Sequence, residues 1–427
     1  PKKGEEKIPE KFIQQKYIWP VGLFLARHVT AQNPAHGSHK EEFYRDYLIL
    51  ESMDKQSNGK ITEIFSTAYN ASILQVLRAG FGLFSLAVED NGLINLHNLP
   101  FEKALVDRFD IDRDITSRVA QAISCKESTL REEWYEKKIL NSNHPEIYWH
   151  YVPAPLYSYP LVSRDGMDGE QYLMPAPQIF IRSFREALFS AIYRKKPNSI
   201  KRGDIDRWIG DAHEDHIEIA LKRIFGKNNV ERIPRTGDEK NAKTKPDFVV
   251  SLSKIELVIE VKTGIGSKED SLVMTPTHIA NLWSRLYKPI TQCAARYKEL
   301  HTDKLKVAMV IIADDIVGEA DPFIHFGKES GLFRELGLTA VEIVSWNDLE
   351  IKLSHTSVEN FEQALLEKWQ KPDAWTSGAI TRHPIPRSVG AHDYEYLEEA
   401  RRAIWNEPFP LPNPPPQAGD GTFEVTS

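Results

Sequence analysis

The residues of this chain with the clearest chemical potential are Asp247, Glu260 and Lys262, at the ends of two neighbouring apolar runs. Asp247 opens the first run, and Glu260 and Lys262 close the second. Side chains on a strand alternate between its faces, so Glu260 and Lys262 share one face while Val261 points into the core. Two carboxylates and an ammonium inside a buried hairpin are costly unless a cation and a substrate share the site. The pattern therefore predicts a site that binds a cation and acts on a substrate.

The elements that must position these residues follow a regular order. Hydrophobic periodicity predicts a succession of helices and strands: helix 204–226, strands near 230–235, 246–252 and 256–262, helix 278–300, strand 305–313, helix 328–336 and strand 340–345. Strands that alternate with helices in this way indicate an α/β fold with a mixed sheet and helical crossovers. The twelve residues between Asp247 and Glu260 suit a tight hairpin.

Asp247, directly after a proline and followed by Glu260-Val261-Lys262, resembles the signature of the PD-(D/E)xK nuclease superfamily. The resemblance covers residues 204–353 and implies a restriction-endonuclease-like core in the order αβββαβ. It also implies that Asp247, Glu260 and the main-chain carbonyl of Val261 hold Mg²⁺, for which Mn²⁺ would substitute, and that Lys262 orients or activates the attacking water. Mg²⁺ prefers oxygen ligands and keeps several waters, so two or three carboxylates suffice when a phosphate supplies the rest.

In such enzymes a third acid comes from the helix that precedes the sheet. Residues 210–221 resemble the superfamily's Gly-x-x-hydrophobic-Glu helix, with His213 at the hydrophobic position as a departure. Glu214 shares a helical face with Ile217, so we expect it to point toward the sheet. Glu218 lies one turn further on and is the alternative. The resemblance thus implies Glu214 as a catalytic and metal-binding residue, with Glu218 left open.

Contacts with nucleic acid are expected from polar residues on both sides of the acids. Gln292 and Arg296 lie on one face of a predicted helix, where they could contact a substrate phosphate. Lys243 and Lys245 precede the first acid by a few positions. These two lysines would either meet phosphate or belong to an ordinary exposed loop.

Composition narrows the class of protein. A chain of 427 residues with 41% hydrophobic and 27% charged residues is typical of a globular protein with two or three domains. We expect no membrane span, because no apolar run is long enough, and the two cysteines predict a reducing, cytoplasmic location. The net charge of −7 argues against a protein that coats DNA non-specifically, because such a protein would be strongly basic. A nuclease with a local basic groove can be acidic overall.

We expect three parts along the chain. Residues 1–195 form a mainly helical N-terminal domain for target recognition, partner docking or self-association, in which one apolar helix is predicted over Ile61–Phe84. Residues 196–355 form the nuclease domain, and residues 356–427 contain C-terminal helices and a proline-rich tail. A basic connector at 194–202 separates the first two parts, and it would meet phosphate or form an exposed loop.

These features predict a metal-dependent nuclease that hydrolyses phosphodiester bonds, foremost a DNA endonuclease of restriction or anti-phage defence. Double-stranded DNA is the expected partner. Cutting both strands predicts a homodimer or higher homo-oligomer, and a separate partner subunit is compatible with the same reading. Two alternatives stay open: a nuclease of DNA repair, recombination or transposition, and a catalytically inactive nuclease-fold module that binds nucleic acid or protein.

Overall fold

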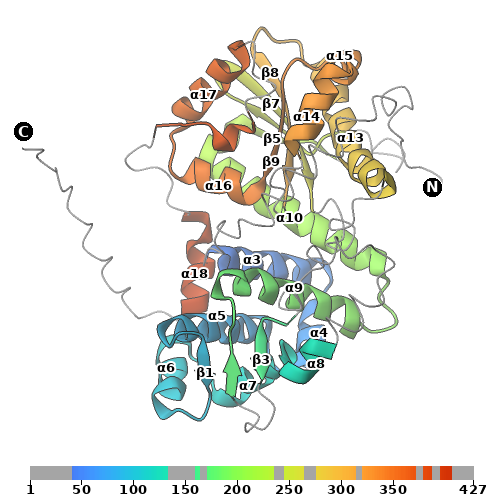
Figure 1. The fold of residues 1–427 in the computed structure, drawn as a ribbon. Coiled ribbons are helices and arrows are strands. Elements are labelled where there is room, and N and C mark those ends of the chain that lie inside the picture. Colours follow the sequence, from blue (N-terminus) through green and yellow to red (C-terminus); the bar gives the residue numbers. More distant parts are fainter. Residues whose placement is uncertain are drawn as a thin grey trace, which may run out of the picture.

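The computed structural model describes residues 41–132, 159–163, 171–234, 245–263, 276–313, 320–371, 378–386 and 395–405. The chain forms a mainly helical N-terminal region followed by an α/β region built on a five-stranded mixed sheet (Figure 1). The predicted fold class, a mixed α/β sheet preceded by a mainly helical region, is therefore confirmed.

The N-terminal region consists of helices packed around one apolar core, with a small sheet at one end. The helices are α3 (Glu41–Gln56), α4 (Lys60–Tyr69), α5 (Ile73–Glu89), α6 (Leu99–Phe109), α7 (Arg113–Ala122), α8 (Glu127–Arg131) and α9 (Pro177–Lys195). The sheet has the order β1-β4-β3-β2, with strands β1 (Leu93–Asn95), β2 (Ser124–Lys126), β3 (Leu161–Ser163) and β4 (Gln171–Leu173). Aromatic rings fill the centre of the core, where the Phe43 and Phe81 ring centroids lie 5.1 Å apart.

The single helix predicted over Ile61–Phe84 is wrong, because the chain breaks it into α4 and α5. Asn70 ends α4 in the left-handed conformation, with φ 49°. Ser72 then caps α5 in a reciprocal pair with Gln75: the Ser72 hydroxyl accepts from the Gln75 N–H, and the Gln75 side chain accepts from the Ser72 N–H. Of the helices the structure describes, none alone has the length and apolarity to cross a membrane; α4 and α5 meet that measure only together, bent by 50°.

The five-stranded sheet has the order β5-β6-β7-β8-β9. Its strands are β5 (Val230–Arg232), β6 (Phe248–Ser251), β7 (Ile255–Lys262), β8 (Leu305–Ile312) and β9 (Val341–Ser345). The β5–β6 and β6–β7 pairs are antiparallel, whereas the β7–β8 and β8–β9 pairs are parallel. With α10 (Arg202–Phe225) before β5 and α13 (Pro276–Glu299) between β7 and β8, the elements run in the order αβββαβ.

Both faces of this sheet are covered, so β7 carries apolar side chains on each side. Leu257, Ile259 and Val261 pack in one core with α10, and Val258 packs in the other core with α13. The remaining helices are α14 (Ala320–Glu329), α15 (Leu332–Leu336), α16 (Trp346–Ser354) and α17 (Val358–Gln370). The helix predicted at 328–336 is in fact the end of α14 followed by α15, because Gly331 adopts a left-handed conformation, with φ 77°, between them.

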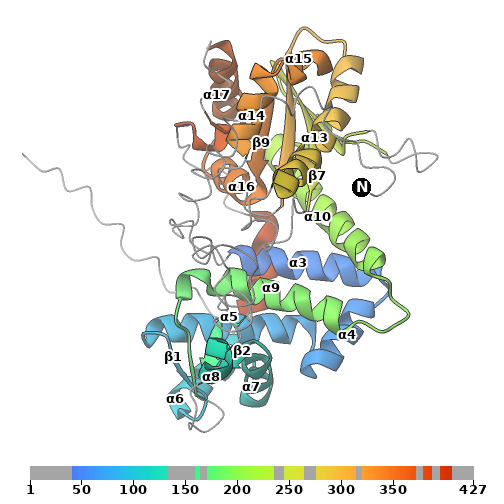
Figure 2. The same cartoon turned by 45° about the vertical axis from the view of Figure 1, so that its right-hand side comes forward.

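Helix α10 belongs to both regions and connects them (Figures 1 and 2). Ile205 and Ala212 pack in the helical core, whereas Ile217 and the apolar residues after it pack under the sheet. The segment predicted as a C-terminal part, 356–427, also contacts both regions. Helix α17 covers the sheet, and α18 (Glu398–Trp405) returns to the helical region, where Trp405 Nε1 donates to Tyr44 Oη at 2.7 Å.

Buried charges join the two regions beside α10. Arg45 of α3 forms an ion pair with Glu350 of α16, and the Nε2 atom of His216 lies 3.7 Å from a Glu350 carboxylate oxygen. Burial alone would raise the pKa of Glu350, but the Arg45 guanidinium, the nearby His216 ring and a hydrogen bond from Tyr396 outweigh it and lower the pKa to about 2. These contacts fix α10, and therefore its acidic face, between the helical region and the sheet.

Candidate active site

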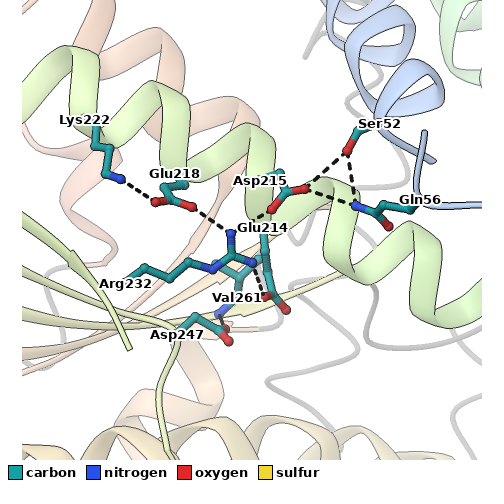
Figure 3. Close-up of polar contacts among 9 residues, drawn as sticks. All are labelled: Ser52, Gln56, Glu214, Asp215, Glu218, Lys222, Arg232, Asp247 and Val261. Atoms are coloured by element: carbon teal, nitrogen blue, oxygen red, sulfur yellow. Dashed lines mark hydrogen bonds and ion pairs between the residues drawn. The ribbon is translucent and has the colours of Figure 1, made fainter. Parts of the chain in front are cut away.

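The β6–β7 hairpin brings Asp247 next to the end of β7. The Asp247 N–H donates to the Ile259 carbonyl at 3.0 Å, which continues the antiparallel ladder by one residue beyond β6. The Asp247 carboxylate in turn accepts a bond from the Val261 N–H at 2.8 Å (Figure 3). Asp247 is only 9% exposed. The hairpin therefore holds this carboxylate in a defined position at the end of the two strands.

Glu260 and Lys262 share the face of β7 that α13 covers, as their spacing predicts. Glu260 is 1% exposed, and its Oε1 atom contacts the Lys262 ammonium. Its other oxygen, Oε2, is buried and has no hydrogen-bond partner within the described part of the chain. Burying an acceptor without a partner costs free energy. This oxygen is consequently available to bind a cation or a hydrogen-bond donor.

The charges at the end of β7 shift one another's titration. Burial and the neighbouring Asp247 raise the pKa of Glu260 to about 8, although the Lys262 ammonium acts in the opposite direction. Burial lowers the pKa of Lys262, but the carboxylates of Glu260 and Asp247 outweigh this effect and raise it above its ordinary value. Lys262 is therefore held as an ammonium in this arrangement.

Glu214, not Glu218, lies close enough to influence the hairpin acids. Glu214 is buried, extends from α10 toward Asp247, and acts electrostatically on both Glu260 and Lys262 (Figure 3). Glu218, one turn further on, is occupied by Lys222 in a side-chain contact and by Arg232 at 2.7 Å. These bonds outweigh burial and lower the pKa of Glu218. The structure thus brings together Asp247, Glu260, Lys262 and Glu214.

Arg232 is a member of this cluster that the sequence did not reveal. Its guanidinium lies 2.7 Å from Asp215 and 3.5 Å from Glu214, in addition to its contact with Glu218. Asp215 also accepts bonds from Gln56 Nε2 at 3.1 Å and from Ser52, both on α3 (Figure 3). In the sequence, Arg232 is simply a basic residue on the strand that follows an acidic helix. Its ion pairs with the acids of α10 form only because β5 packs beside α10.

The residues predicted to contact nucleic acid lie around the acids in different surroundings. Gln292 is buried: its Nε2 donates to the Lys245 carbonyl at 3.0 Å, so it supports the segment that leads into Asp247. Lys245 itself is exposed beside that segment. Arg296 pairs with Glu299 at 3.1 Å and with Glu231 of β5 at 3.7 Å. Lys243 lies outside the described residues.

The donor atoms at this end of the hairpin suit a hard cation such as Mg²⁺. Asp247, Glu260 and Glu214 supply carboxylate oxygens. The Val261 carbonyl points to the same side of β7 as the Ile259 carbonyl, which faces Asp247. Among the described residues, no three acidic, histidine or cysteine side chains are already grouped to hold an ion by themselves. A bound Mg²⁺ would therefore also rely on the Val261 carbonyl, on waters and on substrate oxygens.

The chain also contains two cysteines, whose thiols are reactive side chains of another kind. Cys125 and Cys293 are both buried. Burial raises the pKa of the Cys293 thiol well above its ordinary value.

Comparison of the chain with protein-family models, with curated proteins and with solved structures found no match.

Proposed function

We propose that this protein is a metal-dependent nuclease of the PD-(D/E)xK kind, with its active site at the end of the β6–β7 hairpin. The observation that carries the proposal is Glu260: a carboxylate buried beside Asp247 and Lys262, with one oxygen that lacks a partner among the described residues. A fold selected only for stability would fill such a position with an apolar side chain. The αβββαβ element order and the position of Glu214 support the same proposal.

The chain's own residues divide the work in this proposal. Asp247, Glu260, Glu214 and the Val261 carbonyl would hold the cation. When bound, Mg²⁺ would lower the pKa of a coordinated water and neutralise charge on the reacting phosphate. Lys262, held as an ammonium, would orient the attacking water by hydrogen bonding and stabilise negative charge on the phosphate oxygens. Gln292 would keep the segment before Asp247 in place.

The substrate and biological setting rest on the resemblance. We propose double-stranded DNA as the substrate, an endonuclease of restriction or anti-phage defence as the role, and a homodimer or higher homo-oligomer as the unit that cuts both strands. A nuclease of repair, recombination or transposition would use the same site chemistry.

One observation favours a second candidate, a nuclease-fold module that binds nucleic acid without cutting it. Arg232 forms an ion pair with Glu214, and Lys262 forms one with Glu260, as these cations would in a site that had lost its metal. Such a module would bind duplex DNA in the presence of Mg²⁺ and leave it intact.

Cleavage of covalently closed circular DNA separates the two candidates. The full chain with Mg²⁺ should nick or linearise the circle, and a chelator should abolish the reaction. Lys262→Ala should lower the rate about 10²- to 10³-fold, because it removes a charge aimed at the phosphate. Lys254→Ala is the matched control, since Lys254 is an exposed lysine at the opposite end of the same hairpin. Binding of intact DNA by all three proteins would instead support the non-cutting module.

A further inference from the structure

Four exposed cations gather at the turn between α9 and α10. Arg194 and Lys195 end α9, and Lys201 and Arg202 begin α10; we call this group the basic corner. Within the described ranges, no carboxylate lies at ion-pair distance from any of the four. The Arg202 guanidinium stands 5.5 Å from the centre of the Tyr193 ring.

The acids near the basic corner are engaged with other groups. Asp206 accepts a bond from the Tyr193 hydroxyl at 2.6 Å. Asp204 accepts from the Lys201 backbone N–H at 3.2 Å and lies 3.4 Å from Arg207. Lys196, the remaining cation of the turn, donates to the Ile200 carbonyl and shapes the turn itself. Asp204 and Asp206 therefore offset part of the positive charge, but neither forms an ion pair with the basic corner, which keeps a net positive charge.

The helix dipoles favour two of the four cations of the basic corner and disfavour the other two. Arg194 and Lys195 lie at the C-terminus of α9, where cations interact favourably with the helix dipole. Lys201 and Arg202 lie at the N-terminus of α10, where the same dipole disfavours them. In a chain with a net charge of −7, a cluster of cations in such a position indicates an anionic partner.

The basic corner lies at a fixed distance from the candidate active site, because one helix carries both. Arg202 and Glu214 are twelve residues apart on α10, which corresponds to about 18 Å along its axis. This length equals about five phosphate steps along one strand of B-DNA. In both overall views the α9–α10 turn lies on the same side as α13, the helix that covers the face of Glu260 (Figures 1 and 2).

We propose that the basic corner binds the phosphate backbone of double-stranded DNA about five base pairs from the bond that is cut. This inference rests on the proposed nuclease function and assigns it a second, sequence-independent contact. The corner would supply affinity and orientation, whereas the hairpin acids and Lys262 would supply chemistry.

The salt dependence of binding tests this proposal. The full chain is titrated with a 30-base-pair duplex in a chelating buffer, which prevents hydrolysis, at several salt concentrations. Replacing all four cations of the basic corner with glutamine should reduce the slope of log Kd against log salt by about three to four, since each lost phosphate contact removes about 0.9. A control variant changes four exposed lysines elsewhere to glutamine: Lys103, Lys126, Lys227 and Lys371. The control should keep the slope of the unmodified chain.

Three results would overturn the proposal: an unchanged slope in the basic-corner variant, an equal reduction in the control, or a change seen with duplex RNA alone. Its failure is distinguishable from failure of the nuclease proposal. If the chain does not cut DNA but its binding depends on the basic corner, the nuclease proposal fails and the phosphate contact of the basic corner stands. If the chain cuts DNA with Mg²⁺ but the salt slope does not change in the basic-corner variant, the nuclease proposal stands and the phosphate contact fails.

Discussion

Replacing Glu260 with glutamine should change how the stability of the metal-free protein depends on pH. Glu260 is 1% exposed, and burial together with Asp247 raises its pKa from 4.5 to about 8. This difference corresponds to roughly 5 kcal/mol when the carboxylate is fully ionised. Because the folded state holds the proton more tightly than the unfolded chain, this contribution to the free energy of unfolding falls as pH rises from about 4.5 to about 8. Between pH 5 and pH 8 the expected loss is roughly 3 to 4 kcal/mol.

Glutamine cannot ionise, so Glu260→Gln should escape this loss. Urea denaturation in a chelating buffer at pH 5, 6, 7 and 8 measures the effect as the difference between the variant and the unmodified protein. That difference should shift in favour of the variant by roughly 3 to 4 kcal/mol across the range. Titrations of groups that do not interact with Glu260 cancel in the comparison.

Glu256→Gln is the matched control for this experiment. Glu256 lies on the same face of the same strand and is also buried, but its carboxylate is held by Lys304 at 3.0 Å and by Ser251 at 2.7 Å. The control should not gain stability at pH 8 relative to pH 5. Parallel pH profiles for Glu260→Gln and the unmodified protein would refute the view that the fold retains a costly carboxylate at the end of β7.

Three further predictions concern the charges around α10. Arg232→Gln should lower the free energy of unfolding by about 1 kcal/mol, because three acids lose a partly exposed partner. In urea denaturation, added Mg²⁺ should restore part of this lost stability. A loss of stability that does not respond to Mg²⁺ would contradict a cation site beside Glu214. Burial and nearby cations lower the pKa of His213 well below 6.5, so its neutral form favours folding above pH 6.5 and that contribution disappears on acidification. His213→Gln should flatten the pH profile of stability between pH 6.5 and 5, and an unchanged profile would refute this. In urea denaturation, Glu350→Gln should destabilise the protein by about 3 to 5 kcal/mol, because it leaves Arg45 buried without its ion pair. A loss of stability below about 1 kcal/mol would show that the Arg45–Glu350 ion pair does not join the two regions.

The sheet and its flanking helices could be predicted because they leave local patterns. Strands β6, β7 and β8 are apolar runs of suitable length, and α13 has clear helical periodicity. The break between α4 and α5 could also have been read, since Ser72 and Gln75 have the spacing of a capping box. Continuous apolar periodicity from Ile61 onward obscured it.

What could not be predicted depends on tertiary contacts. The Arg232 cluster forms only because β5 pairs at the edge of the sheet beside α10. The burial of Gln292 against the Lys245 carbonyl depends on how α13 crosses the hairpin. The return of α18 to the helical region joins residues more than 300 positions apart, as in the bond between Trp405 and Tyr44. The position of Glu214 near the hairpin acids, and that of Glu218 beside Lys222 and Arg232, likewise follow only from the packing of α10.

Calorimetric titration of the full chain with Mn²⁺ measures whether the acids at the end of the hairpin hold a divalent cation, and it needs neither substrate nor partner. We expect saturable binding that Glu260→Gln and Asp247→Asn weaken strongly and that Glu256→Gln leaves unchanged. Absence of binding, or binding of equal strength in Glu260→Gln and the unmodified protein, would contradict this expectation.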